Sequence, residues 1–343
     1  MELPNRSDLL LTFEQMTKES YNGIYGVARL RIGNPTRKVV IAALTHGDEP
    51  SGLGAFRFLL DNRHILKDVE LILAVHNIDG GARWFQAATW SERHQCRALG
   101  WNFNRLPLDF PDNSHGPAAL NRLRQLWMHV YPDTTHALDI HSADQPLAPD
   151  GLILDILGSQ SELDRIGDVL PASIRFRGIT ELQAREGSRT KPVGTILGGP
   201  SGEAVAIEIE SDSHESPVGI KIAVQSAIAM LTELGCISET EIVERNGEQS
   251  IFDVLGAVMV PSEGYRFVAP RLLQSFAPVR TGEPLLTGPQ GEIRVRHSGH
   301  LIFAPANLEL EPGDEKEEAC FELSDRQIRY RRMRLPKWAE YNS

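Results

Sequence analysis

The sequence predicts an α/β protein in which a mixed, mainly parallel sheet is flanked by helices and followed by a smaller β-rich domain. Up to about residue 235, short apolar runs alternate with segments of helical periodicity, as in sheets that helices cover on both faces. From about residue 240, glycine and proline separate short alternating runs, and no long helical period remains. With 343 residues, of which 41% are hydrophobic, the chain is long enough for two domains, which we expect at 1–240 and 241–343.

The first domain opens its strand and helix pattern at residues 38–44, where KVVIAAL predicts a buried strand. Residues 51–63 then place apolar side chains at helical spacing. The run VELILAVH at 69–76 predicts a second strand, and Pro117 opens a helical pattern that extends to Val130. These elements therefore alternate as strand, helix, strand and helix.

Three further strands are predicted at residues 135–141 (THALDIH), 151–157 (GLILDIL) and 204–210 (AVAIEIE). A long helix follows, because Ser216 is a good N-cap, Pro217 suits the first helical position and Gly235 suits the end. In the C-terminal domain, short strands are predicted in YRFVAP, EIRVRH and HLIFAP, at 265–270, 292–297 and 300–305.

The composition restricts the classes of partner and compartment. A formal charge of −11 argues against broad binding to nucleic acid or to an anionic membrane, so we expect neither partner. Three cysteines without a C-x-x-C pair favour a reducing compartment, and we expect a cytoplasmic protein. No run approaches the ~18 apolar residues of a membrane span, and we expect no signal peptide. The sequence does not indicate an oligomeric state.

Histidine and acidic residues three positions apart are candidate metal ligands. About 1.5 such pairs are expected by chance from 11 histidines and 46 acidic residues in 343. The chain holds four: His46/Glu49, His76/Asp79, His136/Asp139 and His141/Asp144. Spacing alone therefore does not identify a metal site.

Position in the predicted sheet separates these pairs, because sites in such folds lie beyond the carboxyl ends of strands. His46 and Glu49 follow the end of one strand, and His141 is the last residue of another. His136 begins its strand and is expected to stay away from that edge. His76 also ends a strand, but we interpret it as a structural, hydrogen-bonded histidine.

Four motifs follow one another along the first domain: HGDE at 46–49, RALGWNFNR at 97–105, LDIH at 138–141 and AIEIE at 206–210. Together they resemble the succinylglutamate desuccinylase and aspartoacylase family of zinc carboxypeptidase-like hydrolases, over roughly residues 38–235. The C-terminal stretch that begins GEPLLTGPQ is loosely similar to the closing β segment of succinylglutamate desuccinylases. The resemblance implies a zinc-carboxypeptidase-like fold and a zinc-dependent amidohydrolase acting on linear amides.

Carried over to this chain, the resemblance implies that His46, Glu49 and His141 bind one zinc ion per chain. Two nitrogens and one carboxylate suit zinc and leave a position for water, whose pKa then falls towards ~7. Asp139 lies on the same strand face as His141 and is a candidate for orienting that ligand.

The remaining motif residues imply the other roles in the reaction. Arg97 corresponds to the arginine that polarises the scissile carbonyl. Asn104 and Arg105 correspond to the pair that holds the substrate carboxylate, and Glu208 corresponds to the general base. The substrate implied is a small anionic N-acyl amino acid.

Two departures from the family pattern leave alternatives open. Asn102 stands where the family often has aspartate, and Glu210 stands where many members have glycine, so either Glu208 or Glu210 could be the base. Arg83 or Arg93 could take the place of Arg97. A metallocarboxypeptidase, or a zinc-binding protein without turnover, are the alternative functions.

Overall fold

The computed structural model describes residues 4–97, 99, 103, 104, 106, 107, 110, 111, 118–143, 150–178, 180, 190–214, 216–237, 249–253, 266–273, 277–296, 298–301, 330 and 331. The chain forms two compact units, one of Met1–Phe176 with Arg189–Ser250 and one of Arg177–Ser188 with Ile251–Ser343. None of the helices in the described part of the chain has the length and apolar character that crossing a membrane requires.

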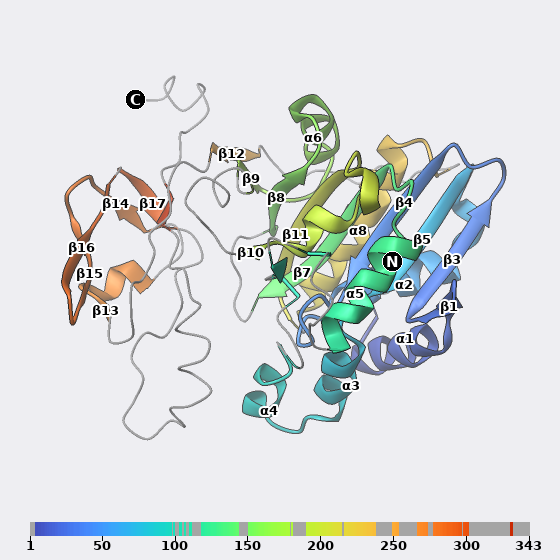
Figure 1. Cartoon of the computed structure of the whole chain (residues 1–343), viewed down its shortest axis with the longest axis horizontal. Coiled ribbons are helices and arrows are strands. Elements are labelled where there is room, and N and C mark those ends of the chain that lie inside the picture. The colour runs from blue at the N-terminus through green and yellow to red at the C-terminus, as the bar shows by residue number, and fades with distance from the viewer. Residues whose placement is uncertain are drawn as a thin grey trace. The chain divides into compact units, whose positions relative to one another are not determined.

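Helices surround a central sheet in the first unit (Figure 1). The helices are α1 (Arg6–Lys18), α2 (Gly52–Asp61), α3 (Ile78–Gln86), α4 (Trp90–His94), α5 (Ala118–His129), α6 (Gln160–Gly167) and α8 (Pro217–Glu233). The 3₁₀ turns are η1 (Arg63–Ile65), η2 (Val193–Ile196) and η3 (Gly199–Ser201).

Within the described residues the central sheet has eight strands in the order β12-β9-β8-β11-β7-β4-β5-β3. They are β3 (Val27–Ile32), β4 (Arg37–Ala43), β5 (Val69–Val75), β7 (His136–Ala143), β8 (Leu152–Leu157), β9 (Ile174–Arg177), β11 (Val205–Ser213) and β12 (Ser250–Asp253). Two small pairs are β1 (Ser20–Tyr21) with β2 (Ile24–Tyr25) and β6 (Leu106–Pro107) with β10 (Thr190–Lys191). Because β3 and β8 pair antiparallel with their neighbours β5 and β11, the sheet is mixed, as predicted.

In its described residues the second unit contains two small antiparallel sheets, which confirms the expected β-rich C-terminal segment. One has the order β13 (Arg266–Phe267), β15 (Pro284–Gly288) and β16 (Gly291–Arg294), and η4 (Pro270–Leu273) follows β13. The other has the order β14 (Pro278–Val279), β17 (Gly299–Leu301) and β18 (Tyr330–Arg331). Their apolar side chains form a separate core, of Leu272, Ala277, Val279, Leu285, Leu286 and Val295.

Three neighbouring parallel strands, β4, β7 and β11, align the functional motifs. Asp139 on β7 is level with Ala42 on β4 and with Glu208 on β11, and His141 is level with Glu210. The carboxyl ends of the three strands therefore meet at one edge of the sheet. Strand β7 extends two residues beyond His141, which the sequence pattern placed last, because its pairing with β11 continues to Ala143.

Helix α8 has the caps that the sequence predicts. The Ser216 side chain accepts hydrogen bonds from the backbone N–H groups of Val218 and Gly219, Pro217 is the first helical residue, and Gly235 has a φ of +68° just beyond the end. The apolar face of α8 packs with α2 and with the alternate residues Val205, Ile207 and Ile209 of β11. The opposite face of β11 is left to Glu208 and Glu210.

A buried ion pair joins β8 and β9. The Arg175 side chain is fully buried, and its guanidinium donates to both oxygens of Asp155 at 2.8 and 2.7 Å. It also lies 3.1 Å from Asp164 on α6. A Cβ atom at Gly167 would lie 2.5 Å from the guanidinium carbon, so α6 can cover Arg175 only because this position is glycine.

His136 lies at the start of β7, away from the edge that carries His141, as expected from the sequence. Burial, and then Arg165, lower the pKa of His136 to about 4. The folded pKa is therefore below the unfolded value of about 6.5, so the unfolded chain binds more protons between these values. This histidine should cost up to about 3 kcal/mol of stability as the pH falls from 6.5 to 4.

We expect His136→Gln to remove that part of the acid dependence. Urea unfolding of wild type and variant at pH 7.5 and at pH 4 measures this dependence. The variant should lose less stability than wild type between pH 7.5 and pH 4. Parallel stability curves over this range would contradict the assignment.

Candidate active site

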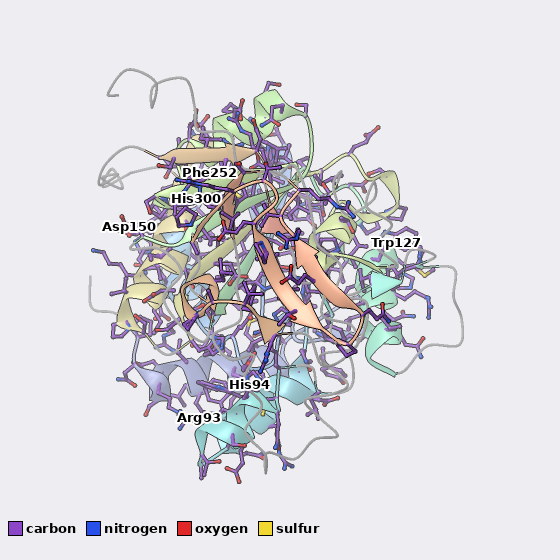
Figure 2. The ribbon with its side chains drawn as sticks, turned by 90° about the vertical axis from the view of Figure 1, so that its left-hand side faces the viewer. Arg93, His94, Trp127, Asp150, Phe252 and His300 are labelled. Atoms are coloured by element: carbon purple, nitrogen blue, oxygen red, sulfur yellow. The ribbon has the colours of Figure 1, made fainter. Side chains whose placement is uncertain are left out.

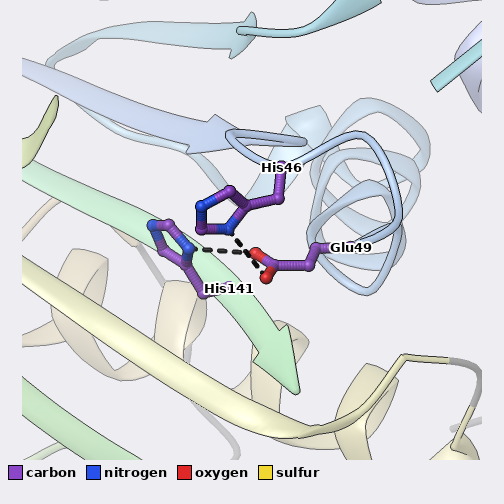
Figure 3. A group of neighbouring side chains, drawn as sticks. All are labelled: His46, Glu49 and His141. Carbon is purple, nitrogen blue, oxygen red and sulfur yellow. Dashed lines mark hydrogen bonds and ion pairs between the residues drawn. The ribbon is translucent and has the colours of Figure 1, made fainter. Parts of the chain in front are cut away.

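Three side chains converge where β4 and β7 approach α2 (Figure 3). His46 Nδ1 lies 2.8 Å from Glu49 Oε1, and His141 Nδ1 lies 2.9 Å from Glu49 Oε2. One ligand atom from each residue lies within 4.8 Å of the others, and all three residues are buried. The structure thus brings together the three residues that the sequence predicts as ligands, here called the triad.

The backbone after β4 turns sharply to place His46. Leu44, which is fully buried, has a φ of +54°, in the left-handed region that non-glycine residues rarely occupy. Beyond His46, the chain passes so close to the turn after α4 that a Cβ atom at Gly47 would lie 2.3 Å from the Cys96 carbonyl oxygen. The Gly47 N–H donates to the Arg97 carbonyl at 3.1 Å. The loop that carries His46 and the loop that carries Arg97 are therefore packed directly on each other.

The charges of the triad suit a cation. Burial, and then Arg97, lower the pKa of His46 to about 4, so the ring is neutral at pH 7 and has a lone pair to offer. Burial disfavours the Glu49 carboxylate, but His46, Arg97 and His141 lower its pKa well below the usual range. Burial also disfavours the charged form of His141, but Asp139 and Glu49 raise its pKa well above the usual value. A metal at the triad would replace the proton between His141 and Glu49.

The donor set fits zinc. Two imidazole nitrogens and one carboxylate, all buried and converging on one point, match the three protein ligands of catalytic zinc sites. Asp139 accepts from His141 Nε2 at 3.0 Å, which leaves Nδ1 to face the triad. The triad can therefore hold a metal ion through His141 Nδ1.

Arg97 contacts the triad from the turn that follows α4. Its Nη1 donates to Glu49 Oε1 at 2.7 Å and lies 3.5 Å from Asp48 Oδ1, and the side chain remains 28% exposed. By contrast, the guanidinium of Arg93 lies over the Trp84 ring, 5.9 Å from its centre. Figure 2 shows Arg93 beside His94 on the cyan ribbon of α4. Arg83 is exposed on α3. Contact with the triad favours Arg97 among the three, and its role remains a prediction.

The segment after Arg97 is described in part. Asn104 Oδ1 accepts from the backbone N–H of Val193, at the start of η2, at 3.1 Å. This contact ties the Asn104 segment to η2. Arg105 and Asn102 lie outside the described residues, so the predicted grip on a substrate carboxylate stays a prediction.

Glu208 lies next to the triad on β11. Its exposed fraction is 2%, and one carboxylate oxygen lies within 4.8 Å of ligand atoms of Asp139 and His141. A Cβ atom at Gly194 would lie 2.9 Å from Glu208 Oε1, so the missing side chain at Gly194 makes room for the carboxylate. Burial, and then Glu49, raise the pKa of Glu210 to about 8. Both glutamates lie on one strand face, as predicted, and the choice between them needs the variants discussed below.

Two residues at the site were not predicted. Asp48 is buried, with an exposed fraction of 1%, although it lies between the two predicted ligands of HGDE. His214, after the end of β11, has Nδ1 2.9 Å from Ser142 Oγ and Nε2 3.7 Å from Asp48 Oδ2. Asp48 stands between His46 and Glu49 in HGDE, so the sequence could have indicated that it lies near the triad. No sequence pattern connects His214 with Ser142.

Known proteins match this chain in structure but not in sequence. No protein-family model matches the sequence, and no curated protein matches it in sequence. Solved structures do match. The succinylglutamate desuccinylase/aspartoacylase from Rhodobacter sphaeroides has a TM-score of 0.60 at 14% identity, covering 90% of this chain and 88% of that one.

The chain has the fold of the succinylglutamate desuccinylase and aspartoacylase structures. Succinylglutamate desuccinylase from Vibrio cholerae has a TM-score of 0.59 at 13% identity, covering 94% of this chain and 93% of that one. A mutant of murine aminoacylase 3 has a TM-score of 0.53 at 17% identity, covering 89% of this chain and 96% of that one. The resemblance inferred from the motifs is thus confirmed for the desuccinylase/aspartoacylase fold.

Proposed function

We propose that this protein is a zinc-dependent hydrolase that cleaves the amide bond of a small anionic N-acyl amino acid in the cytoplasm. The observation that supports it best is the buried triad with Glu208 beside it, in a chain of the desuccinylase/aspartoacylase fold. A solvated surface pair would be exposed, whereas the exposed fractions of the triad residues are 4% or less.

His46, Glu49 and His141 would hold the zinc ion. A zinc ion held there would act as a Lewis acid and would lower the pKa of a water molecule towards ~7. Glu208 takes the proton of the attacking water and delivers it to the leaving amine. Arg97 stabilises the negative charge that develops on the carbonyl oxygen. Donors of this kind in other enzymes typically lower the activation free energy by about 3 kcal/mol each.

Substrate selection rests on cationic and amide groups near the triad. Arg97 is partly exposed there, and Asn104 and Arg105 are proposed to hold the substrate carboxylate. An amide substrate with one free carboxylate would place its carbonyl towards Arg97 and its carboxylate towards the Asn104 and Arg105 pair.

The test is release of free amine from a panel of N-acyl amino acids and short peptides. Protein stripped with a chelator is compared with the same protein resupplied with zinc. Zinc-dependent turnover of a small acyl amino acid, with peptides left intact, is the expected result. Cleavage of peptides from the C-terminus would instead make the protein a carboxypeptidase, and zinc binding without turnover of any panel member would make it a binding protein.

Zinc binding itself should depend on the triad. We expect Glu49→Gln to raise the Kd for zinc by at least about 100-fold, because the amide carries no charge and binds zinc poorly. Competition with a chromogenic chelator measures it. The matched control is Glu70→Gln, which removes a carboxylate paired with Arg29 on β3 and β5 and should leave zinc binding unchanged. Equal zinc affinity in both variants would exclude the triad as the site.

A further inference from the structure

A row of hydrogen bonds leads from the triad into the core behind it. His141 Nε2 lies 3.0 Å from Asp139 Oδ2, and Thr45 Oγ1 donates to the same carboxylate at 2.9 and 3.1 Å. His76 Nδ1 lies 2.7 Å from Thr45 Oγ1, and His76 Nε2 lies 2.7 Å from the Tyr131 hydroxyl. The exposed fraction of each of these five residues is 0%. Solvent water therefore cannot replace a lost partner without opening the core.

The hydrogens in this row have one arrangement that satisfies every group. Burial lowers the pKa of His76 to about 4, so its ring is neutral and carries a single N–H. Burial, and then Asp139, raise the pKa of Tyr131, which keeps the phenol protonated. If Thr45 donated to His76, the Thr45 oxygen and the Asp139 carboxylate would face each other as two acceptors at 2.9 Å. Thr45 therefore donates to Asp139, and His76 Nδ1–H donates to Thr45.

The remaining bonds follow from that choice. His76 Nε2 has a free lone pair and accepts from the Tyr131 hydroxyl. At the other end, the Asp139 carboxylate accepts from Thr45 and from His141 Nε2–H. His141 consequently keeps its proton on Nε2 and turns Nδ1 towards Glu49, which lies 2.9 Å away. Every donor in the row points towards Asp139.

We propose that Thr45, His76 and Tyr131 are positioning residues that hold Asp139, and through it His141, in the tautomer that presents Nδ1 to the metal. This inference rests on the proposed metal site. The side-chain hydrogen bonds of His76 run to Thr45 and to Tyr131, so both residues act on His141 through the row. Through the row, the geometry of the ligand His141 depends on Tyr131, which lies just after the end of α5.

Arg122 on α5 fixes the backbone at the centre of the row. Its Nε donates to the His76 carbonyl at 2.8 Å and its Nη2 donates to the Val75 carbonyl at 2.5 Å. These bonds satisfy carbonyl groups where β5 ends and leave the His76 side chain free to face Thr45. Thr45 thus bonds to His76, 31 positions away in the sequence, and to Asp139, 94 positions away.

The experiment removes single donors and measures zinc affinity by chelator competition. Thr45→Val keeps the shape of the side chain and removes the hydroxyl, and it should raise the Kd for zinc by about 10- to 100-fold. Tyr131→Phe removes the donor farthest from the triad along the row and should raise the Kd for zinc by a smaller, few-fold factor. Thr45→Ser restores the hydroxyl and should restore the affinity. The graded loss and its rescue are what a positioning row requires.

A matched control distinguishes this effect from loss of stability. Ser226 is fully buried in α8 and its hydroxyl donates to the Ile222 carbonyl at 2.7 Å, so Ser226→Ala also removes one buried hydroxyl. Urea unfolding of each variant gives its stability, and Ser226→Ala should leave the Kd for zinc unchanged at a similar loss of stability. In the zinc-bound protein, ¹⁵N NMR of the His141 ring should show a protonated Nε2 in wild type.

The outcomes separate this inference from the proposed function. Zinc bound tightly by wild type, with the same Kd in Thr45→Val and Tyr131→Phe, would overturn the positioning row and leave the metal site intact. A zinc-bound His141 that carries its proton on Nδ1 would do the same. A wild-type protein that binds no zinc at all would overturn both.

Discussion

Replacing Glu208 by glutamine should lower kcat for the best substrate of the panel by about 100- to 10,000-fold, the usual contribution of a general base. The amide occupies the same volume beside Asp139 and His141 but cannot accept the proton of the attacking water. Because Glu208 is not a member of the triad, the Kd for zinc should stay close to that of wild type. Steady-state kinetics with zinc-loaded protein, together with chelator competition, measures both quantities.

Glu210→Gln is the matched control for that prediction. It is the same substitution two residues along the same strand face, level with His141 instead of Asp139. A large loss in Glu208→Gln with a small one in Glu210→Gln would assign the base to Glu208. The reverse pattern would assign it to Glu210, and full activity in both would remove the glutamate base from the mechanism.

The second large effect is expected outside the triad, at the ion pair of Asp155 on β8 and Arg175 on β9. Asp155→Asn keeps the volume but leaves the buried guanidinium without its nearest charge, and we expect a loss of about 3 kcal/mol in the free energy of unfolding. Urea unfolding measures it. Asp164→Asn also removes a carboxylate near Arg175, at 3.1 Å, but that side chain is 36% exposed, so its loss should be below about 1 kcal/mol. Equal losses of stability in the two variants would show that the burial of Asp155 does not determine the size of the loss.

A double replacement separates the charge from the packing. Asp155→Leu with Arg175→Met removes both charges and keeps an apolar contact between β8 and β9. It should recover most of the stability that Asp155→Asn loses, because a buried guanidinium that has lost its nearest and most buried partner costs more than the absence of the pair. A double variant less stable than Asp155→Asn would point to a packing role instead.

The triad could be predicted from the sequence because strand ends are visible in a sequence. An apolar run that stops before HGDE fixes where His46 and Glu49 emerge, and the parallel order of strands brings His141 to the same edge. The caps of α8 could be predicted for a related reason: Ser216, Pro217 and Gly235 act on backbone groups within a few residues of themselves.

Long-range partners could not be predicted in the same way. The row from Tyr131 to Asp139 joins residues whose separation in sequence carries no pattern, and each is an ordinary polar residue beside an apolar run. Arg175 in IRFR has the spacing of an alternating edge strand, which favours an exposed arginine. Only the packing of α6 over β8 and β9 buries it beside Asp155.

The contact of Gly47 with the Cys96 carbonyl and the Arg97 backbone has a consequence for how this protein can change. Any side chain at position 47 would push away the turn that holds Arg97, so the two loops fit each other only as a pair. A longer or different segment before Arg97 would have to arrive together with a rebuilt HGDE loop. A change of substrate by mutation is therefore expected to require changes in other loops, because the HGDE loop and the turn of Arg97 can change only together.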